Sequence, residues 1–193
     1  MRISGGVARG IPLQVPKADA VRPATDGMRQ RGFSSLGERV VGARFLDLFA
    51  GSGAYGLEAL SRGAEGGVWV EQHRQTKALL ERNVDAVCRS MGRRIRAGLK
   101  VMQGDALTAA WPTELGLPDL VFVDPPYPII EEVAPKVFGR LQTMLAEIED
   151  VIVVFELPGG MDLQPSGWEC VKRIGKGLRQ PTVAFFRRDR GRH

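Results

Sequence analysis

The sequence of 193 residues contains few of the residues that build metal sites and disulfide frameworks. It has two cysteines, Cys88 and Cys170, and two histidines, His73 and His193. Neither pair has the spacing of a metal or redox motif, so we expect no metal and no disulfide network. No apolar run approaches the roughly 20 residues that cross a bilayer, and the N-terminus lacks the apolar core of a signal peptide. We therefore expect a cytoplasmic protein that does not enter a membrane.

Charge is distributed unevenly along a chain of otherwise ordinary composition. Hydrophobic residues make up 44% and charged residues 25% of the chain, which is typical of one globular domain and excludes a disordered protein. Residues 1–44 carry a net charge of +5, residues 45–171 carry −7 and residues 172–193 carry +7. Two basic ends favour contact with a polyanion such as RNA. Solvated tails remain an alternative, chiefly for the last residues.

Apolar runs and helical patterns alternate over residues 44–157. Runs of strand length are followed by segments with helical periodicity, which predicts a parallel sheet covered on both faces. The expected strands are 45–49, 67–71, 100–102, 120–123 and 151–155, with helices after Gly53 and over 76–87 and 131–145. Two later runs, 168–174 and 182–187, have no helix between them and predict an antiparallel hairpin. Short runs at 2–4 and 11–15 predict a small β-hairpin before the main sheet.

A glycine-rich turn follows the first predicted strand. Gly51, Gly53 and Gly56 have the spacing of a dinucleotide fingerprint, and Glu71 ends the next strand, where a carboxylate can accept hydrogen bonds from a ribose. Asp47 lies within the first strand, where its charge would repel a pyrophosphate and attract a sulfonium cation. The pattern therefore favours S-adenosylmethionine over a nicotinamide dinucleotide. A tight turn that binds no ligand is the alternative.

Two further acidic loops are expected at the same edge of the sheet. Asp105 follows the third strand and is suited either to accept from an adenine amino group or to cap the next segment. Asp124, Pro125, Pro126 and Tyr127 follow the fourth strand as a rigid corner rich in acceptors. The Asp124 carboxylate and the Pro125 carbonyl can hold the two N–H groups of a planar amine, with Tyr127 stacking on its ring. This corner is the predicted catalytic site.

The sequence resembles the RsmD family over nearly its whole length. The resemblance lies in the run from Asp47 to Ala64, in Phe122-Val-Asp-Pro-Pro-Tyr127, in Met1-Arg-Ile-Ser-Gly-Gly6 and in Arg22-Pro-Ala-Thr-Asp26. The family implies a Rossmann-like, class I α/β fold with a mostly parallel seven-stranded sheet. It also implies S-adenosylmethionine-dependent methylation of the exocyclic N2 amine of one guanine in 16S ribosomal RNA.

The resemblance also implies a set of site residues and partners. The substrate would be 16S RNA or a small-subunit assembly particle. Residues 1–43 would form a hairpin, cofactor lid and RNA-binding extension, and residues 44–193 the methyltransferase domain. From the charge of the two basic ends, rather than from the resemblance, we expect Arg2, Arg9 and Arg187 to bind RNA. The cofactor would be bound by Arg22, Thr25, Asp47, Ala50, Gly51, Gly53, Glu71, Asp105 and Ala106.

The sequence departs from the family pattern directly after Asp26. The segment 27–34 gains Gly27 and Gly32 and loses a glutamate and an arginine, and each glycine costs a helix about 1 kcal/mol relative to alanine. We expect a looser lid there. Three alternatives remain: an adenine-N6 methyltransferase, an RNA-binding homologue with impaired catalysis, and a nicotinamide-dependent oxidoreductase. The last leaves the corner at Asp124 and both basic ends unexplained.

Overall fold

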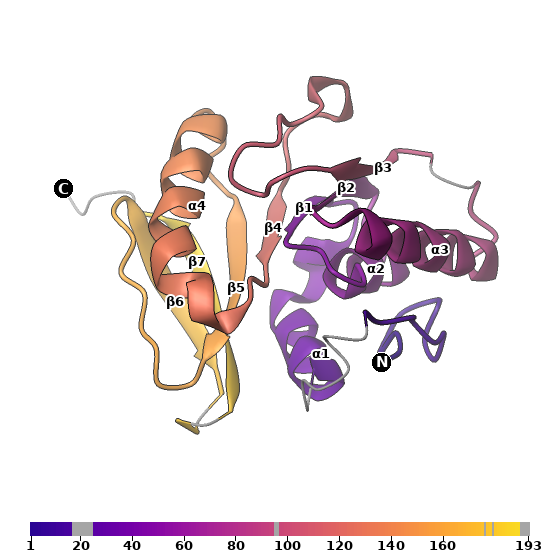
Figure 1. Cartoon of the computed structure of the whole chain (residues 1–193), viewed down its shortest axis with the longest axis horizontal. Helices are drawn as coiled ribbons and strands as arrows, with labels where there is room; N and C mark the ends of the chain where they lie inside the picture. The colour runs from indigo at the N-terminus through magenta and orange to yellow at the C-terminus, as the bar shows by residue number, and fades with distance from the viewer. Residues whose placement is uncertain (17–24, 95–96, 176, 179, 190–193) are drawn as a thin grey trace.

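The computed structural model describes residues 1–16, 25–94, 97–175, 177–178 and 180–189. Its centre is a seven-stranded sheet in the order β3-β2-β1-β4-β5-β7-β6 (Figure 1). The strands are β1 (Arg44–Leu48), β2 (Gly66–Glu71), β3 (Leu99–Gln103), β4 (Leu120–Val123), β5 (Ile152–Pro158), β6 (Trp168–Ile174) and β7 (Pro181–Arg188). The helices are α1 (Thr25–Leu36), α2 (Ala54–Ser61), α3 (Arg74–Ser90) and α4 (Ile130–Met144), with 3-10 turns η2 (Gly37–Val40), η3 (Thr113–Leu115) and η4 (Tyr127–Ile129).

The strand pairing confirms the predicted sheet. Strands β1 to β5 pair in parallel, and β7 runs antiparallel to both β5 and β6. The parallel strands are joined through helices or long loops, whereas β6 and β7 form the predicted C-terminal hairpin. Because β1 to β5 point the same way, their carboxyl ends meet at one edge of the sheet, where α/β proteins bind ligands.

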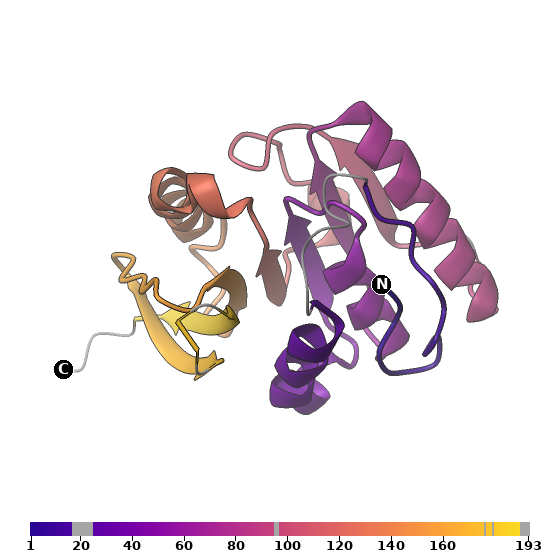
Figure 2. The ribbon, with the colours of Figure 1, turned by 60° about the horizontal axis from the view of Figure 1, so that its bottom comes forward.

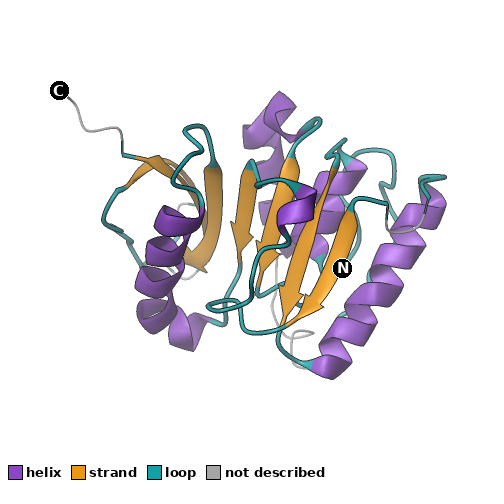
Figure 3. Cartoon of the chain, turned by 90° about the horizontal axis from the view of Figure 1, so that it is seen from above, coloured by secondary structure: helices purple, strands orange, loops and turns teal. Residues whose placement is uncertain are grey.

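Helices cover both faces of the sheet, as Figure 3 shows. Alternate strand residues point to opposite faces, and this divides the core in two. On one face α1, α2 and α3 pack on a layer that includes Phe45, Trp69 and Phe122. On the other, α4 and the loop after β3 pack on a layer that includes Leu46 and Val121. The central strands are therefore buried on both faces, which explains their uninterrupted apolar sequences.

The segment with the altered family pattern forms helix α1 in spite of its two glycines. Gly27 and Gly32 lie within Thr25–Leu36, and a methyl group added at Gly27 would meet nothing within 4 Å. Phe33 packs against Phe122 of β4, with ring centroids 5.4 Å apart. Packing against the sheet therefore stabilises a segment whose intrinsic helix propensity is low.

The predicted N-terminal β-hairpin is not formed. Within residues 1–16, the structure has one isolated antiparallel bridge, between Arg2 and Pro12. The segment runs along α2 and α3 (Figure 2), and its backbone N–H groups bond to those helices. Ala8 donates to Ser61 Oγ and Gln14 donates to Asn83 Oδ1, both at 2.9 Å. The Ile3 N–H donates to the Ile11 carbonyl and the Leu13 N–H donates to the Met1 carbonyl, both at 3.0 Å, so pairing exists around this one bridge but does not extend into two strands.

Candidate functional site

A cavity of about 500 Å³ opens at the carboxyl ends of the parallel strands. Its size is that of a small-molecule site. Loops after β1, β2, β3 and β4 contribute to it, together with the end of β5. The predicted site residues that line it are Ala50, Gly51, Glu71, Ala106, Asp124 and Pro126. The structure therefore brings together the glycine turn, the carboxylate after β2 and the corner after β4.

Glu71 joins two loops at the cavity wall. Its Oε2 atom accepts a hydrogen bond from the Gly51 N–H at 2.9 Å, and its Oε1 atom accepts from the His73 N–H at 2.8 Å. The residue is buried, although it lines the cavity. Two backbone bonds fix the carboxylate in place, which prepares it to accept further hydrogen bonds from a ligand.

Asp47 is not among the residues that line the cavity. Its side chain is buried, with 1% of the residue exposed, and its Oδ2 atom accepts from the Gly56 N–H at 2.9 Å. Burial raises the pKa of the Asp47 carboxyl from 3.8 to about 8; the bond from Gly56 opposes this rise and the charge of Glu71 adds to it. Asp47 is therefore mostly uncharged at neutral pH. It holds the start of α2 instead of presenting a charge to a ligand.

Gly53 and Asp105 are likewise not among the residues that line the cavity, and their contacts in the structure are with the loops. Gly53 is the N-cap of α2 with φ of 79°, and a Cβ atom there would lie 2.1 Å from Leu80 Cδ1. Asp105 is exposed, and its Oδ1 atom accepts from the Leu107 N–H at 2.8 Å. The capping alternative for Asp105 therefore describes its local contacts. Its neighbours Gly104 and Ala106 line the cavity in its place.

Some residues of the corner after β4 line the cavity, and the others pack in the core. Asp124 and Pro126 line the cavity, whereas Pro125 is buried. Tyr127 is half-buried and packs against the core cluster on the α4 side of the sheet. Asp124 extends β4 by one residue, with its N–H bonded to the Leu48 carbonyl at 3.5 Å. The strand thus carries the carboxylate directly to the cavity wall.

Among the cavity residues that sequence reasoning missed are Arg29, Tyr55 and Glu156. The Tyr55 hydroxyl donates to Glu156 Oε2 at 2.6 Å, and both side chains are buried. Burial raises the pKa of Tyr55, and the charges of Glu156 and Asp124 raise it further. A sequence signal existed for Glu156, because a single acid near the end of an apolar strand repeats the arrangement of Asp124 on β4. Arg29 and Tyr55 carried no comparable signal.

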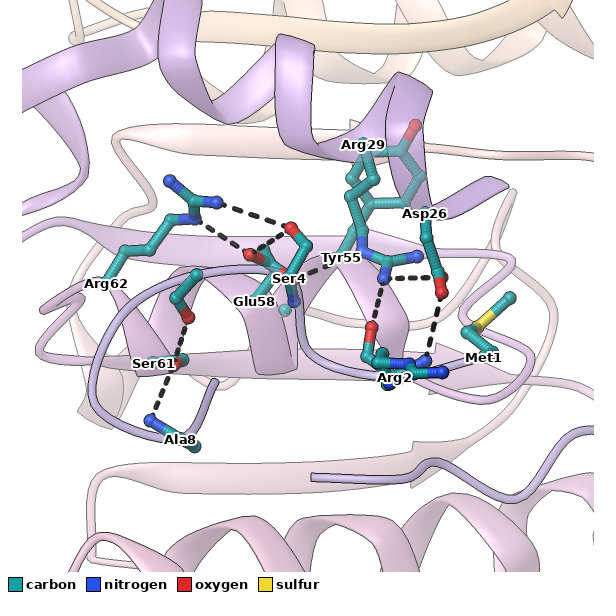
Figure 4. A network of polar contacts seen from close by, with 12 residues as sticks. Met1, Arg2, Ser4, Ala8, Asp26, Arg29, Tyr55, Glu58, Ser61 and Arg62 are labelled. Atoms are coloured by element: carbon teal, nitrogen blue, oxygen red, sulfur yellow. Dashed lines mark hydrogen bonds and ion pairs between the residues drawn. The ribbon is translucent and has the colours of Figure 1, made fainter. Parts of the chain in front are cut away.

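Arg29 belongs to a buried network that ties the N-terminus to α2 (Figure 4). The centre of the network is Glu58, which is 0% exposed. Glu58 accepts hydrogen bonds from Ser4 and Arg62 and pairs with Arg29 at 3.3 Å. Arg29 also donates to the Arg2 carbonyl at 2.6 Å. A buried charge network of this kind fixes the first residues beside the cavity, which Met1 also lines.

Phe49, another cavity residue, has a strained backbone. It is the only non-glycine residue with positive φ in the described part of the chain, at 57°. This conformation is costly for a bulky residue and occurs mostly where the surrounding structure imposes it. The loop after β1 is therefore held in a defined shape at the cavity wall.

The remaining predicted residues lie elsewhere. Arg22 falls outside the described residues, and Thr25 begins α1. Arg2, Arg9 and Arg187 are exposed. Arg187 follows Phe186, which pairs with Val153 near the start of β5, so it lies at the edge of the sheet opposite the cavity. None of the helices that the structure describes is long and apolar enough to span a bilayer.

Comparison with known proteins places this arrangement in a family. The model of the family described as conserved hypothetical protein 95 matches residues 1–185. Ribosomal RNA small subunit methyltransferase D of Escherichia coli K12 is 35% identical over 172 residues, which cover 87% of this chain and 81% of the relative. The solved structure of the Escherichia coli methyltransferase yhhF superimposes with a TM-score of 0.72 at 28% identity, covering 98% of each chain.

A more distant structure shares the fold. An RNA methyltransferase of Salinibacter ruber, solved with S-adenosyl-L-homocysteine, has a TM-score of 0.57 at 16% identity and covers 89% of this chain and 97% of its own. At that identity the likeness concerns the fold alone. The family match and the Escherichia coli relative show more: the chain belongs to the RsmD family, to which the conserved hypothetical protein 95 model corresponds.

Proposed function

We propose that this protein transfers a methyl group from S-adenosylmethionine to the exocyclic N2 amine of a guanine in 16S ribosomal RNA. The observation that carries the proposal is that Asp124 and Pro126 line the same cavity as Gly51 and Glu71. A corner suited to hold an amine therefore faces a glycine turn suited to hold a nucleoside. Membership of the RsmD family supports the same reaction.

The groups that line the cavity suit S-adenosylmethionine, because they include a hydrogen-bond acceptor for the ribose and apolar side chains for the adenine. The Glu71 carboxylate is fixed at the wall, where ribose hydroxyls can donate to it. Val70, Ala106 and Ile129 provide apolar wall for an adenine ring. When bound, S-adenosylmethionine supplies an electrophilic methyl group on a sulfonium. The residues that we propose to hold it are Ala50, Gly51, Glu71 and Ala106, with Arg22 and Thr25 assigned by family resemblance alone.

The charge balance of the cavity favours this cofactor over a nicotinamide dinucleotide. Among the described lining residues, Glu71, Asp124 and Glu156 carry carboxyl groups, whereas Arg29 alone carries a guanidinium group. A pyrophosphate would meet repulsion from these acids, but a sulfonium and an ammonium group would be attracted. We therefore expect calorimetry to detect binding of S-adenosylmethionine and no binding of NAD.

Asp124 is the residue that we propose to orient the substrate amine. The lone pair of a guanine amine is delocalised into the ring, so the nitrogen is a poor nucleophile until hydrogen bonds fix its position. The Asp124 carboxylate accepts one N–H and the Pro125 carbonyl accepts the other, while Tyr127 stacks on the base. Because the methylated amine releases its proton readily, the site needs no strong general base.

RNA contact is proposed for the basic ends. Arg2 is exposed next to Met1, which lines the cavity, whereas Arg9 is exposed next to Ala8, which bonds to Ser61 at the end of α2 away from the cavity. Arg187 is exposed at the edge of the sheet opposite the cavity. Residues 1–43 would then act as an RNA-binding and cofactor-closing extension of a methyltransferase domain formed by residues 44–193. The partner would be 16S RNA or a small-subunit assembly particle in the cytoplasm.

The test is methyl transfer to small-subunit RNA and to assembly particles, with the product identified by mass spectrometry of nucleosides. Asp124→Ala should lower turnover by about a hundredfold or more with little change in cofactor affinity, whereas Asp124→Asn should keep part of the activity. Asp150→Ala is the matched control, since Asp150 is exposed and its ion pair with Arg39 lies far from the cavity. Wild-type turnover by Asp124→Ala would contradict the assignment, and N6-methyladenosine as product would contradict the substrate.

A further inference from the structure

Glu156 and Asp124 lie side by side on neighbouring strands. Val123 of β4 pairs with Phe155 of β5 in parallel register, so the next residues along the two strands are Asp124 and Glu156. Both line the cavity, and Glu156 is 3% exposed. The proposed catalytic carboxylate therefore has a second carboxylate beside it, at the position of the next strand.

A rigid donor holds the Glu156 carboxylate in place. The Tyr55 hydroxyl donates to Glu156 Oε2 at 2.6 Å, and the Tyr55 ring stacks on Phe122 with centroids 5.4 Å apart. Because burial and the nearby acids raise the pKa of Tyr55, its hydroxyl keeps its proton and remains a donor. A carboxylate has about four acceptor positions, so it can bind Tyr55 and a ligand donor at the same time.

Burying a carboxylate at this place is costly unless hydrogen-bond donors reach it. A tyrosine in the core could be satisfied by a neutral acceptor at a much lower desolvation cost. The site instead keeps a carboxyl group at the wall of the cavity, next to Asp124. Together with Asp124, this acceptor is suited to a ligand that presents two neighbouring N–H groups.

We propose that Glu156 accepts the N1–H of the target guanine while Asp124 holds its N2 amine, so that the pair selects guanine over adenine. This inference rests on the proposed function. The Watson–Crick edge of guanine presents N1–H and the N2 amine as adjacent donors, which match two adjacent carboxylates. Adenine presents its N1 lone pair beside its amine, and this lone pair would face the Glu156 charge. The site thus rejects adenine by repulsion as well as by a missing bond.

The test replaces the target guanine by 2-aminopurine, which keeps the exocyclic amine but has a lone pair in place of N1–H. The methylated position is first located in the wild-type product, and the two RNAs are then assembled by ligation of a synthetic segment. The measured quantity is the ratio of kcat/KM for guanine to kcat/KM for 2-aminopurine. In Glu156→Gln the amide can donate to the 2-aminopurine N1, so the ratio should fall by about tenfold or more relative to wild type.

Two further variants separate recognition from support of the fold. Tyr55→Phe keeps the carboxylate and should lower both rates while the ratio still favours guanine. Glu147→Gln, at an exposed site in the loop before β5, should leave both rates unchanged.

A ratio in Glu156→Gln equal to that of wild type would overturn the inference and leave the proposed function intact. Equal use of the two RNAs by wild type would also overturn it, without any need for a variant to fold. Failure of wild type to form N2-methylguanosine would instead contradict the proposed function.

Discussion

Replacing Asp47 by asparagine should change how the stability of the protein depends on pH. In the unfolded chain this carboxyl ionises near its ordinary pKa of 3.8, whereas in the folded protein it keeps its proton until about pH 8. Between these values the folded state binds one more proton, so wild-type stability falls as pH rises, by about 1.4 kcal/mol per pH unit from this group. At pH 8 and above, the accumulated loss is on the order of 5 kcal/mol.

Asp47→Asn removes this loss, because the amide does not ionise and its oxygen can still accept from the Gly56 N–H. Urea unfolding at about pH 5, 6 and 7 gives the free energy of each protein, and contributions of other groups cancel in the difference. As pH rises, the free energy of unfolding of the variant should increase relative to that of wild type by about 1.4 kcal/mol per pH unit. Asp150→Asn, at an exposed ion pair, is the control and should show no such gain. A difference for Asp47→Asn that is flat or falling with pH would refute the argument.

The other predictions concern ligands. Glu71→Ala should weaken S-adenosylmethionine binding by about 1 to 3 kcal/mol in calorimetry, because a fixed charged acceptor is lost, and unchanged affinity would remove Glu71 from the site. RNA affinity should fall with salt at a log-log slope of several units, and charge reversal of Arg2, Arg9 and Arg187 together should reduce that slope but not cofactor affinity. Reversal of Arg2 alone should account for the largest single share of the reduction, since Arg9 near the end of α2 and Arg187 near the start of β5 both lie away from the cavity. An unchanged slope would show that these residues are only solvated.

The elements of the sheet could be predicted because their patterns are local. The apolar run ending at Val123 and the run starting near Ile152 are buried on both faces, so their hydrophobicity follows directly from their place in the sheet. The N-terminal hairpin was predicted wrongly for the opposite reason. Its short runs have strand-like patterns, but within residues 1–16 they pair only around the bridge from Arg2 to Pro12. The segment is also held by Ser61 and Asn83, which lie far away in the sequence and bind its Ala8 and Gln14 N–H groups.

By itself the sequence determined the order of strands and helices, the glycine turn at Gly51 and the corner at Asp124, because spacing and residue type specify these features. Only the tertiary structure decided which acids face the cavity. Asp47 turned out to be buried beneath α2, while Glu156 came to the wall. Side-chain direction at a strand end depends on neighbouring strands and on the helix packed above them. The charge state of Asp47 was decided in the same way, since desolvation is a property of the whole packed core.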